Sequence, residues 1–300
     1  MKPIKIACIQ MRCSADRMEN IDKAERAVRR AAQQGANLIL LPELFERPYF
    51  CQERRYEYYE YAEPVRENLA VQRLQKLTAE LNVAVPVSLF ERDGNAFYNS
   101  VAMLDGGKLL GVYRKTHIPD DHYYQEKFYF TPGNTGFLVF STQFCNVGVG
   151  ICWDQWFPET ARCLALNGAD VLLFPTAIGS EPILTVDSAG HWQRVMQGHA
   201  AANVMPVVAA NRIGTESVIP CAENGYQSSE LRFYGSSFLT DATGERIAVA
   251  SRENEEILYA EYDFAQIRRM RWEWGLSRDR RPDTYSPIIK YMGKSNGRCR

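Results

Sequence analysis

The stretch NVGVGICWDQWFPETARCLALNGADVLLFP, residues 146–175, decides the fold class of this 300-residue chain. Apolar residues 147–151 predict a strand, a proline and a glycine then bracket a helix, and apolar residues 171–174 predict a second strand. This order is typical of a β–turn–α–β unit, and it places Cys152 at the carboxyl end of a strand, where open α/β sheets hold their chemistry. Backbone N–H groups and a helix dipole at such a turn would favour a thiolate.

The rest of the chain alternates between strand-like and helix-like patterns. We expect strands at 4–10, 37–42, 83–90, 99–105, 108–113, 206–211 and 256–262, and helices at 17–34, 68–82 and 188–203. Turn residues at 106–107 and 241–244 predict hairpins. This pattern predicts an α/β protein whose mixed sheets are covered by helices on their outer faces. Residues 47–66 and 117–135 show no clear element, and unstructured segments of this length are often functional lids.

Composition excludes several classes of protein. Hydrophobic residues make up 46% of the chain and charged residues 24%, which is ordinary for a soluble folded protein. The formal net charge of −1 gives no basic field that would attract nucleic acid. No apolar run approaches the roughly 18 residues that cross a bilayer, and the N-terminal apolar core is too short for a signal peptide. We therefore expect a cytoplasmic protein with no membrane or nucleic-acid partner.

The cysteines do not indicate a disulfide framework or a metal site. The chain has eight of them, scattered and without a CxxC pair, and its four histidines have no close cysteine partners. In a chain of this length that pattern favours reduced thiols. We expect no metal and no organic cofactor.

Three residues that could carry chemistry follow apolar runs in similar ways. Glu43 follows residues 38–42, Lys115 follows residues 109–113, and Cys152 follows its own strand. Taken singly, such a glutamate is more often a cap, such a lysine a surface charge, and such a cysteine a small buried side chain. Strand ends of an α/β sheet can converge on one crevice, where these three would form a base, an oxyanion stabiliser and a nucleophile. A glutamate desolvated in a closed pocket can replace a histidine as the base.

Three segments resemble the signature motifs of a known family. LLPELF around Glu43, YRKTHIP around Lys115 and GVGICWDQWFPE around Cys152 resemble those of the nitrilase superfamily of carbon–nitrogen hydrolases, and the resemblance spans roughly residues 4 to 265. It implies a four-layer α-β-β-α sandwich. It also implies a triad in which the glutamate is the general base, the lysine stabilises the oxyanion and the cysteine attacks the substrate.

The resemblance carries further expectations. It implies that Glu126, in QEKFYFTPG, positions the substrate or the lysine, and that the backbone N–H of Trp153 is a second oxyanion donor. Members of the family usually pair through the helices that cap the sheets. We therefore expect a hydrolase domain at residues 1–265, an arm at residues 266–300 at a subunit interface, and a homo-oligomer built from dimers.

The segments FPTAIGSEP, LFERPYFCQ and CWDQWFPE resemble the N-carbamoylputrescine amidase branch of that family. The resemblance implies hydrolysis of N-carbamoylputrescine to putrescine, carbon dioxide and ammonia, in polyamine synthesis from arginine by way of agmatine. From the residues, Glu181 follows a strand next to that of Cys152, so its carboxylate could pair with a substrate ammonium; alternatively it caps a turn before Pro182. The other residues expected to line the pocket are Tyr49, Tyr124, Trp153, Trp156, Thr176 and Ala177. The tyrosines could instead only pack the lid, and His117 and His122 are expected to orient loops.

Two alternatives remain open at this point. An amidase for ω-amides or 3-ureido acids would need a cation beside the nucleophile, and Asp154, Gln155 and Trp156 supply none. A non-catalytic binding protein of the same fold would need no reactive thiol.

Overall fold

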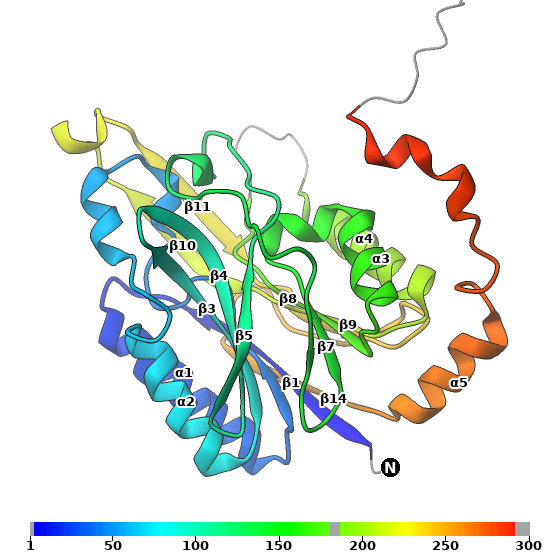
Figure 1. Ribbon diagram of the computed structural model, residues 1–300. Coiled ribbons are helices and arrows are strands. Elements are labelled where there is room, and N and C mark those ends of the chain that lie inside the picture. Colours follow the sequence, from blue (N-terminus) through cyan, green and yellow to red (C-terminus); the bar gives the residue numbers. More distant parts are fainter. Residues whose placement is uncertain (1–2, 181–186, 292–300) are drawn as a thin grey trace, which may run out of the picture.

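The computed structural model describes residues 3–180 and 187–291, which form four stacked layers of helix, sheet, sheet and helix (Figure 1). The α-helices are α1 (Arg17–Gln33), α2 (Leu69–Leu81), α3 (Pro158–Leu166), α4 (Ala189–Asn203) and α5 (Phe264–Trp274). The strands of the first sheet are β1 (Ile4–Arg12), β2 (Leu38–Leu40), β3 (Ala84–Asp93), β4 (Ala96–Asp105), β5 (Lys108–Arg114), β10 (Arg212–Val218), β11 (Ser229–Tyr234) and β14 (Glu256–Tyr262). The strands of the second sheet are β6 (Val139–Ser141), β7 (Asn146–Val149), β8 (Val171–Pro175), β9 (Val207–Ala210), β12 (Phe238–Thr240) and β13 (Arg246–Val249).

Both sheets are mixed. The first runs in the order β11-β10-β1-β2-β3-β4-β5, and β14 pairs antiparallel with most of β1 while the last residues of β1 pair with β10. The second runs in the order β13-β12-β9-β8-β7-β6, and its central strands β7, β8 and β9 are parallel. Parallel neighbours need crossover connections, and here the crossovers are α3 and α4. The predicted α/β sandwich is confirmed.

Side chains of β1 alternate between two hydrophobic cores, one on each face of the first sheet. Ala7, Ile9 and Met11 pack with α1 and α2 on the outer face of the first sheet. Ile6 and Cys8 point the other way, into the core between the sheets. Because side chains alternate across a strand, a strand that is buried on both faces is apolar at nearly every position. A third core fills the space between the second sheet and α3 and α4.

Local sequence sets the ends of the helices. The Asp16 side chain accepts hydrogen bonds from backbone N–H groups of the first turn of α1, and Asn68 caps α2 in the same way. Asn82 ends α2 in a left-handed conformation. Pro158 is the first residue of α3, where its missing N–H costs no helical hydrogen bond.

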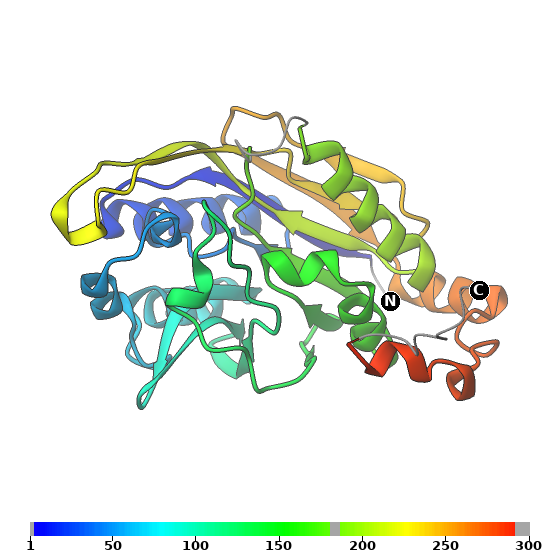
Figure 2. The same ribbon diagram turned by 90° about the horizontal axis from the view of Figure 1, so that it is seen from above.

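The predicted elements are confirmed with shifts of one to three residues at their ends, but the sequence reading missed others. It missed the β10–β11 ribbon, the short strand β6 and helix α5. The expected domain boundary at residue 265 falls within α5. After α5 the chain runs outside the α3–α4 layer with turns at Pro282–Thr284 and Ser286–Ile289 (Figure 2). Within the described residues, none of the helices combines the length and the apolar character needed to cross a bilayer.

The topology brings the ends of three strands to one region. Strands β2 and β5 both run parallel to β3, because β4 is antiparallel to each of its neighbours β3 and β5. Their carboxyl ends, which precede Glu43 and Lys115, therefore lie at the same edge of the first sheet. The second sheet meets this edge where the backbone N–H of Glu43 donates to the carbonyl of Thr176, just after β8, at 3.3 Å.

Candidate active site

Cys152 lies at a sharp turn between β7 and α3. Its φ of +42° is in the left-handed region, which is strained for a residue other than glycine, and such strain clusters at functional sites. The residue starts a short 3-10 helix, Cys152–Trp156, and is buried. The approach to the turn requires a glycine at position 150, since a Cβ there would lie 2.6 Å from Cε1 of Phe174. The Sγ atom lies 3.9 Å from the carbonyl oxygen of Ala177.

A buried lysine lies between two buried carboxylates. The Lys115 Nζ donates to Glu43 Oε1 at 3.0 Å and to Glu126 Oε2 at 2.6 Å. All three side chains are completely excluded from solvent. The charges of these three groups also act on the Cys152 thiol. The structure therefore brings together the four residues that the sequence predicts as catalytic.

Two further contacts fix the glutamates. Asn99 Nδ2 donates to Glu43 Oε1 at 2.6 Å, so that oxygen accepts from both an amide and an ammonium. The other oxygen of Glu43, Oε2, is buried and has no hydrogen-bond partner among the described residues. The hydroxyl of Tyr49 donates to Glu126 Oε1 at 2.6 Å. Glu43 thus has one oxygen that could accept a proton from another group, whereas both oxygens of Glu126 already accept hydrogen bonds from the protein.

The charges of the cluster explain its protonation. Burial lowers the pKa of Lys115, but the carboxylates of Glu126 and Glu43 outweigh burial and raise it well above its usual value. Burial raises the pKa of Glu126 to about 7, against the lowering effect of Lys115. The two carboxylates therefore favour the ammonium form of Lys115, and the pKa of Glu126 lies near neutral pH.

Burial of Cys152 opposes the groups that were expected to favour a thiolate there. Burial raises the pKa of the Cys152 thiol well above its usual value, and the carboxylate of Glu43 raises it further, against Lys115. Helix α3, whose dipole was expected to favour the thiolate, begins only at Pro158, beyond the 3-10 turn. Burial thus favours the neutral thiol, from which a base would take the proton as the sulfur attacks.

Asp154 is a buried residue of the site that the sequence reading did not assign. Its Oδ2 accepts from the N–H of Ile151 at 3.0 Å and from the hydroxyl of Tyr113 at 2.7 Å. Its Oδ1 accepts from the N–H and from Nδ1 of His117, at 2.9 and 2.8 Å. The Asp154 carboxylate thus links Ile151, which precedes Cys152, to Tyr113 and His117, which lie two residues before and after Lys115 in the chain. The expected role of His117 in orienting a loop agrees with these contacts.

The predicted pocket tyrosines have different surroundings. Tyr49 is buried, packs edge-on against Tyr124 and Phe233, and reaches the catalytic cluster through its hydroxyl. Tyr124 accepts a hydrogen bond from the N–H of Gly179 at 3.0 Å, on the loop that follows β8. Tyr49 is therefore a hydrogen-bond partner of Glu126 in the cluster.

The other predicted pocket residues lie around the catalytic turn. Thr176 is buried, and its hydroxyl accepts from Gln155 Nε2 at 3.1 Å. The ring centroids of Trp153 and Trp156 are 6.2 Å apart, and Trp153 is 37% exposed. Glu181 lies outside the described residues.

The family of the chain follows from a comparison with known proteins. The carbon–nitrogen hydrolase family matches residues 5–271. The chain belongs to the carbon–nitrogen hydrolase family. The enzyme is thus a hydrolase that acts on carbon–nitrogen bonds, and the predicted family is confirmed.

Three relatives place the hydrolase more closely. An N-carbamoylputrescine amidase from Oryza sativa subsp. japonica is 50% identical over 98% of this chain and 97% of its own. A citrullinase from Francisella tularensis subsp. tularensis is also 50% identical, over 97% of this chain and 99% of its own. The crystal structure of a carbon–nitrogen hydrolase from Helicobacter pylori G27 is 36% identical and superposes with a TM-score of 0.87 over 97% of this chain and 99% of that one. The predicted resemblance to the N-carbamoylputrescine amidase branch is confirmed.

Another pair of site residues was missed by the sequence reading. Arg212 is fully buried at the start of β10 and donates to the carbonyls of Glu43 and Leu44 at 2.8 and 2.9 Å. It also donates to Glu216 Oε1 at 2.8 Å. The sequence signal was the position of Arg212, which follows an apolar strand and Asn211. A cation at such a position is expected to be buried and therefore to need hydrogen-bond acceptors.

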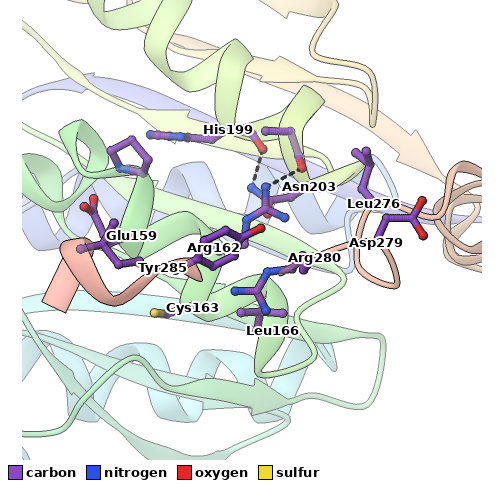
Figure 3. A pocket seen from close by; sticks show the side chains of 13 residues that line it. Glu159, Arg162, Cys163, Leu166, His199, Asn203, Leu276, Asp279, Arg280 and Tyr285 are labelled. Carbon is purple, nitrogen blue, oxygen red and sulfur yellow. Dashed lines mark hydrogen bonds between the residues drawn. The ribbon is translucent and has the colours of Figure 1, made fainter. Parts of the chain in front are cut away.

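The hydrolase also has a cavity of about 680 Å³ far from this chemistry, between α3, α4 and the chain after α5 (Figure 3). Its walls combine apolar side chains such as Leu166 and Leu276 with the guanidinium groups of Arg162 and Arg280. None of the four catalytic candidates lines it. It lies between the α3–α4 layer and the chain that follows α5, and none of the described residues that line it belongs to a strand of the second sheet.

The titration of Glu126 makes stability depend on pH. Well below pH 4.5 this carboxyl is protonated in both the folded and the unfolded chain. As the pH rises from 4.5 to about 7, the unfolded chain loses the proton first, so the free energy of unfolding falls across this window. We expect wild type to lose more stability than Glu126→Gln between about pH 5 and pH 7.5, as measured by denaturant unfolding. The exposed change Glu57→Gln is the control, and an identical pH dependence in wild type and Glu126→Gln would contradict this account.

Proposed function

We propose that the enzyme hydrolyses N-carbamoylputrescine to putrescine, carbon dioxide and ammonia, in polyamine synthesis from arginine by way of agmatine. The observation that carries the proposal is the 50% identity, over nearly the full length of both chains, to an N-carbamoylputrescine amidase. The buried cluster of Glu43, Lys115 and Glu126 beside Cys152 supports it, because it supplies the groups that such a reaction needs.

The first half of the proposed reaction forms a thioester. The Cys152 sulfur attacks the ureido carbon while its proton passes to Glu43, whose Oε2 has no partner among the described residues. Lys115 and the backbone N–H of Trp153 stabilise the oxyanion, each contributing on the order of 3 kcal/mol to the barrier reduction. The intermediate collapses, the C–NH₂ bond breaks, and ammonia leaves with the proton from Glu43. A carbamoyl thioester remains on Cys152.

The second half uses the same base. Glu43 takes a proton from water as the hydroxide attacks the thioester carbon, and the proton returns to the departing sulfur. The product is a carbamate, which decomposes in water to the amine and carbon dioxide. Glu126 keeps Lys115 in place through both steps with its contact at 2.6 Å.

Citrulline is the second candidate substrate, because the citrullinase is as similar to this chain as the N-carbamoylputrescine amidase. Both substrates carry a ureido group and an ammonium group separated by a chain of four carbons. They differ in the α-carboxylate of citrulline, so the chemistry at Cys152 is the same for both. Selectivity between the two substrates therefore depends on the residues that bind the end of the substrate opposite to the ureido group. We propose that Glu181 pairs with the ammonium there and that Tyr124, Trp153, Trp156, Thr176 and Ala177 line the rest of the pocket.

A substrate panel tests this choice. Because a carboxylate at position 181 would repel the carboxylate of citrulline, we expect ammonia release to be fastest with N-carbamoylputrescine and much slower with citrulline, 3-ureidopropionate or an ω-amido acid. We expect Glu181→Gln to lower kcat/KM for N-carbamoylputrescine about 10- to 100-fold, since it removes a charged hydrogen bond. Butylurea, which lacks the ammonium, is the matched control and should be turned over equally by both enzymes. Faster turnover of citrulline by wild type would select the second candidate.

The role of Glu43 has a separate test. We expect Glu43→Gln to lower kcat at least about 1,000-fold, because an amide cannot take the thiol proton. The fold should survive, since the amide oxygen can still accept from Asn99 and Lys115. Ammonia release gives the rate, and Glu25→Gln, which removes a carboxylate between α1 and α2, is the control. Retention of more than about a tenth of wild-type kcat would rule out Glu43 as the base.

We also propose that the enzyme is a cytoplasmic homo-oligomer built from dimers, with residues 1–265 as the hydrolase domain and residues 266–300 as an arm at the interface. Large apolar side chains of the arm are solvent-exposed in the single chain, with Trp272 73% and Trp274 66% exposed. Exposed apolar surface of this kind marks protein interaction sites. The cavity between the arm, α3 and α4 adds further surface that a second subunit would cover.

The oligomer has its own test. Light scattering after size-exclusion chromatography should give the mass of a dimer or a multiple of it. We expect the double change Trp272→Ser and Trp274→Ser to shift the enzyme toward smaller species, because it removes apolar surface from the arm. A wild-type monomer would contradict the proposal.

A further inference from the structure

Arg212 lies where the chain crosses from one sheet to the other. Strand β9 belongs to the second sheet, and β10 begins at Arg212 in the first sheet, paired with Met11 of β1. The guanidinium is fully buried, and its Nε has no hydrogen-bond partner among the described residues. A buried ion pair is weak evidence for stability, because desolvation offsets the attraction. The position of this cation therefore calls for another explanation.

The guanidinium binds the backbone of the segment that carries the general base. Its Nη2 donates to the carbonyls of Glu43 and Leu44, at 2.8 and 2.9 Å, and its Nη1 donates to the carbonyl of Arg47 at 3.3 Å. Leu44 has a φ of +48°, in the left-handed region that is strained for leucine. Such a conformation persists only where neighbouring groups hold it. Here the rigid guanidinium of Arg212 binds the carbonyls of Glu43 and of Leu44 itself.

Glu216 extends the same contact to the other end of the segment. Its Oε1 accepts from Arg212 at 2.8 Å, and its Oε2 accepts from the backbone N–H of Tyr49 at 2.5 Å. The hydroxyl of Tyr49 in turn donates to Glu126 at 2.6 Å. One ion pair thus holds residues 43–49 at both ends, and those ends lead to the two carboxylates that enclose Lys115.

We propose that the buried Arg212–Glu216 ion pair is a positioning unit that sets Glu43 and Glu126 around Lys115 and so orients the base toward Cys152. It touches no reacting atom and acts through the backbone of residues 43–49. The proposal rests on the proposed function, since it assigns these two residues a role in the same reaction. A purely structural ion pair would affect stability and leave the properties of the base unchanged.

Arg212→Lys is the decisive variant, because it keeps the charge and removes the planar fork. We expect kcat for ammonia release to fall about 100-fold, with KM changed less than about threefold, since the substrate is bound but the base is misplaced. We expect the acid limb of the kcat/KM profile to move to higher pH, because a Glu126 carboxyl less well paired with Lys115 would lose part of the lowering effect of that lysine on its pKa. The titratable groups that face Arg212 are Cys13, Glu43 and Glu216. Unchanged kcat and an unchanged pH profile would overturn the proposal.

Two further proteins keep the test decisive. Glu216→Gln retains an oxygen for the Tyr49 N–H but weakens the hold on Arg212, so it should also lower kcat if Arg212→Lys fails to fold. Leu77→Ala opens a cavity in the outer core between α2 and the first sheet and removes no hydrogen bond of Arg212 or Glu216, so it is the control for lost stability. It should leave kcat and the pH profile as in wild type. Loss of kcat in Leu77→Ala equal to that in the other variants would reduce the ion pair to a structural role.

The rate of alkylation separates this proposal from the proposed function. Iodoacetamide labelling of Cys152, followed by peptide mass spectrometry, needs no substrate and depends on the base that takes the thiol proton. We expect labelling at a fixed neutral pH to be at least about tenfold slower in Arg212→Lys and Glu216→Gln than in wild type and Leu77→Ala. If wild type does not hydrolyse N-carbamoylputrescine, the proposed substrate fails, and slower labelling in the variants would still support the positioning role. Equal labelling rates in all four proteins would contradict it.

Discussion

The structure depends on one buried ammonium held between two buried carboxylates. Lys115 contacts Glu43 at 3.0 Å and Glu126 at 2.6 Å, with all three side chains removed from water. Removing Lys115 from the cluster would leave two buried carboxylates without their cation, at a cost of several kcal/mol. The two carboxylates therefore depend on the lysine, and the charges of all three groups act on the thiol of Cys152.

The four-layer fold explains how such a cluster can exist. Strands β2 and β5 bring Glu43 and Lys115 to one edge of the first sheet, and the second sheet brings Cys152 to the same edge. The backbone is strained there, with positive φ at both Leu44 and Cys152. Strain of this kind costs of order 1–3 kcal/mol at each residue and must be offset by contacts nearby. Buried polar side chains around the two turns supply those contacts.

Much of this arrangement could be predicted from the sequence, for a physical reason. An apolar run that ends in one charged or nucleophilic residue marks a strand end, and this rule located Glu43, Lys115 and Cys152. The same rule also points to Arg212, which follows the apolar strand β9, but it does not reveal what Arg212 does. It could not find Asp154 at all, because the contacts of both residues join segments far apart in the chain. The protonation of the thiol was also beyond a local reading, since the burial that raises its pKa is a property of the assembled layers.

The central claim is that a neutral thiol at Cys152 becomes a nucleophile only as Glu43 removes its proton, and that the reaction passes through a thioester. Rapid-quench mass spectrometry of the peptide that carries Cys152, taken during turnover of N-carbamoylputrescine, tests it most directly. The account predicts a carbamoyl adduct on that cysteine which appears and disappears within one turnover. Undiminished turnover with Cys152 unmodified at every time point would contradict it.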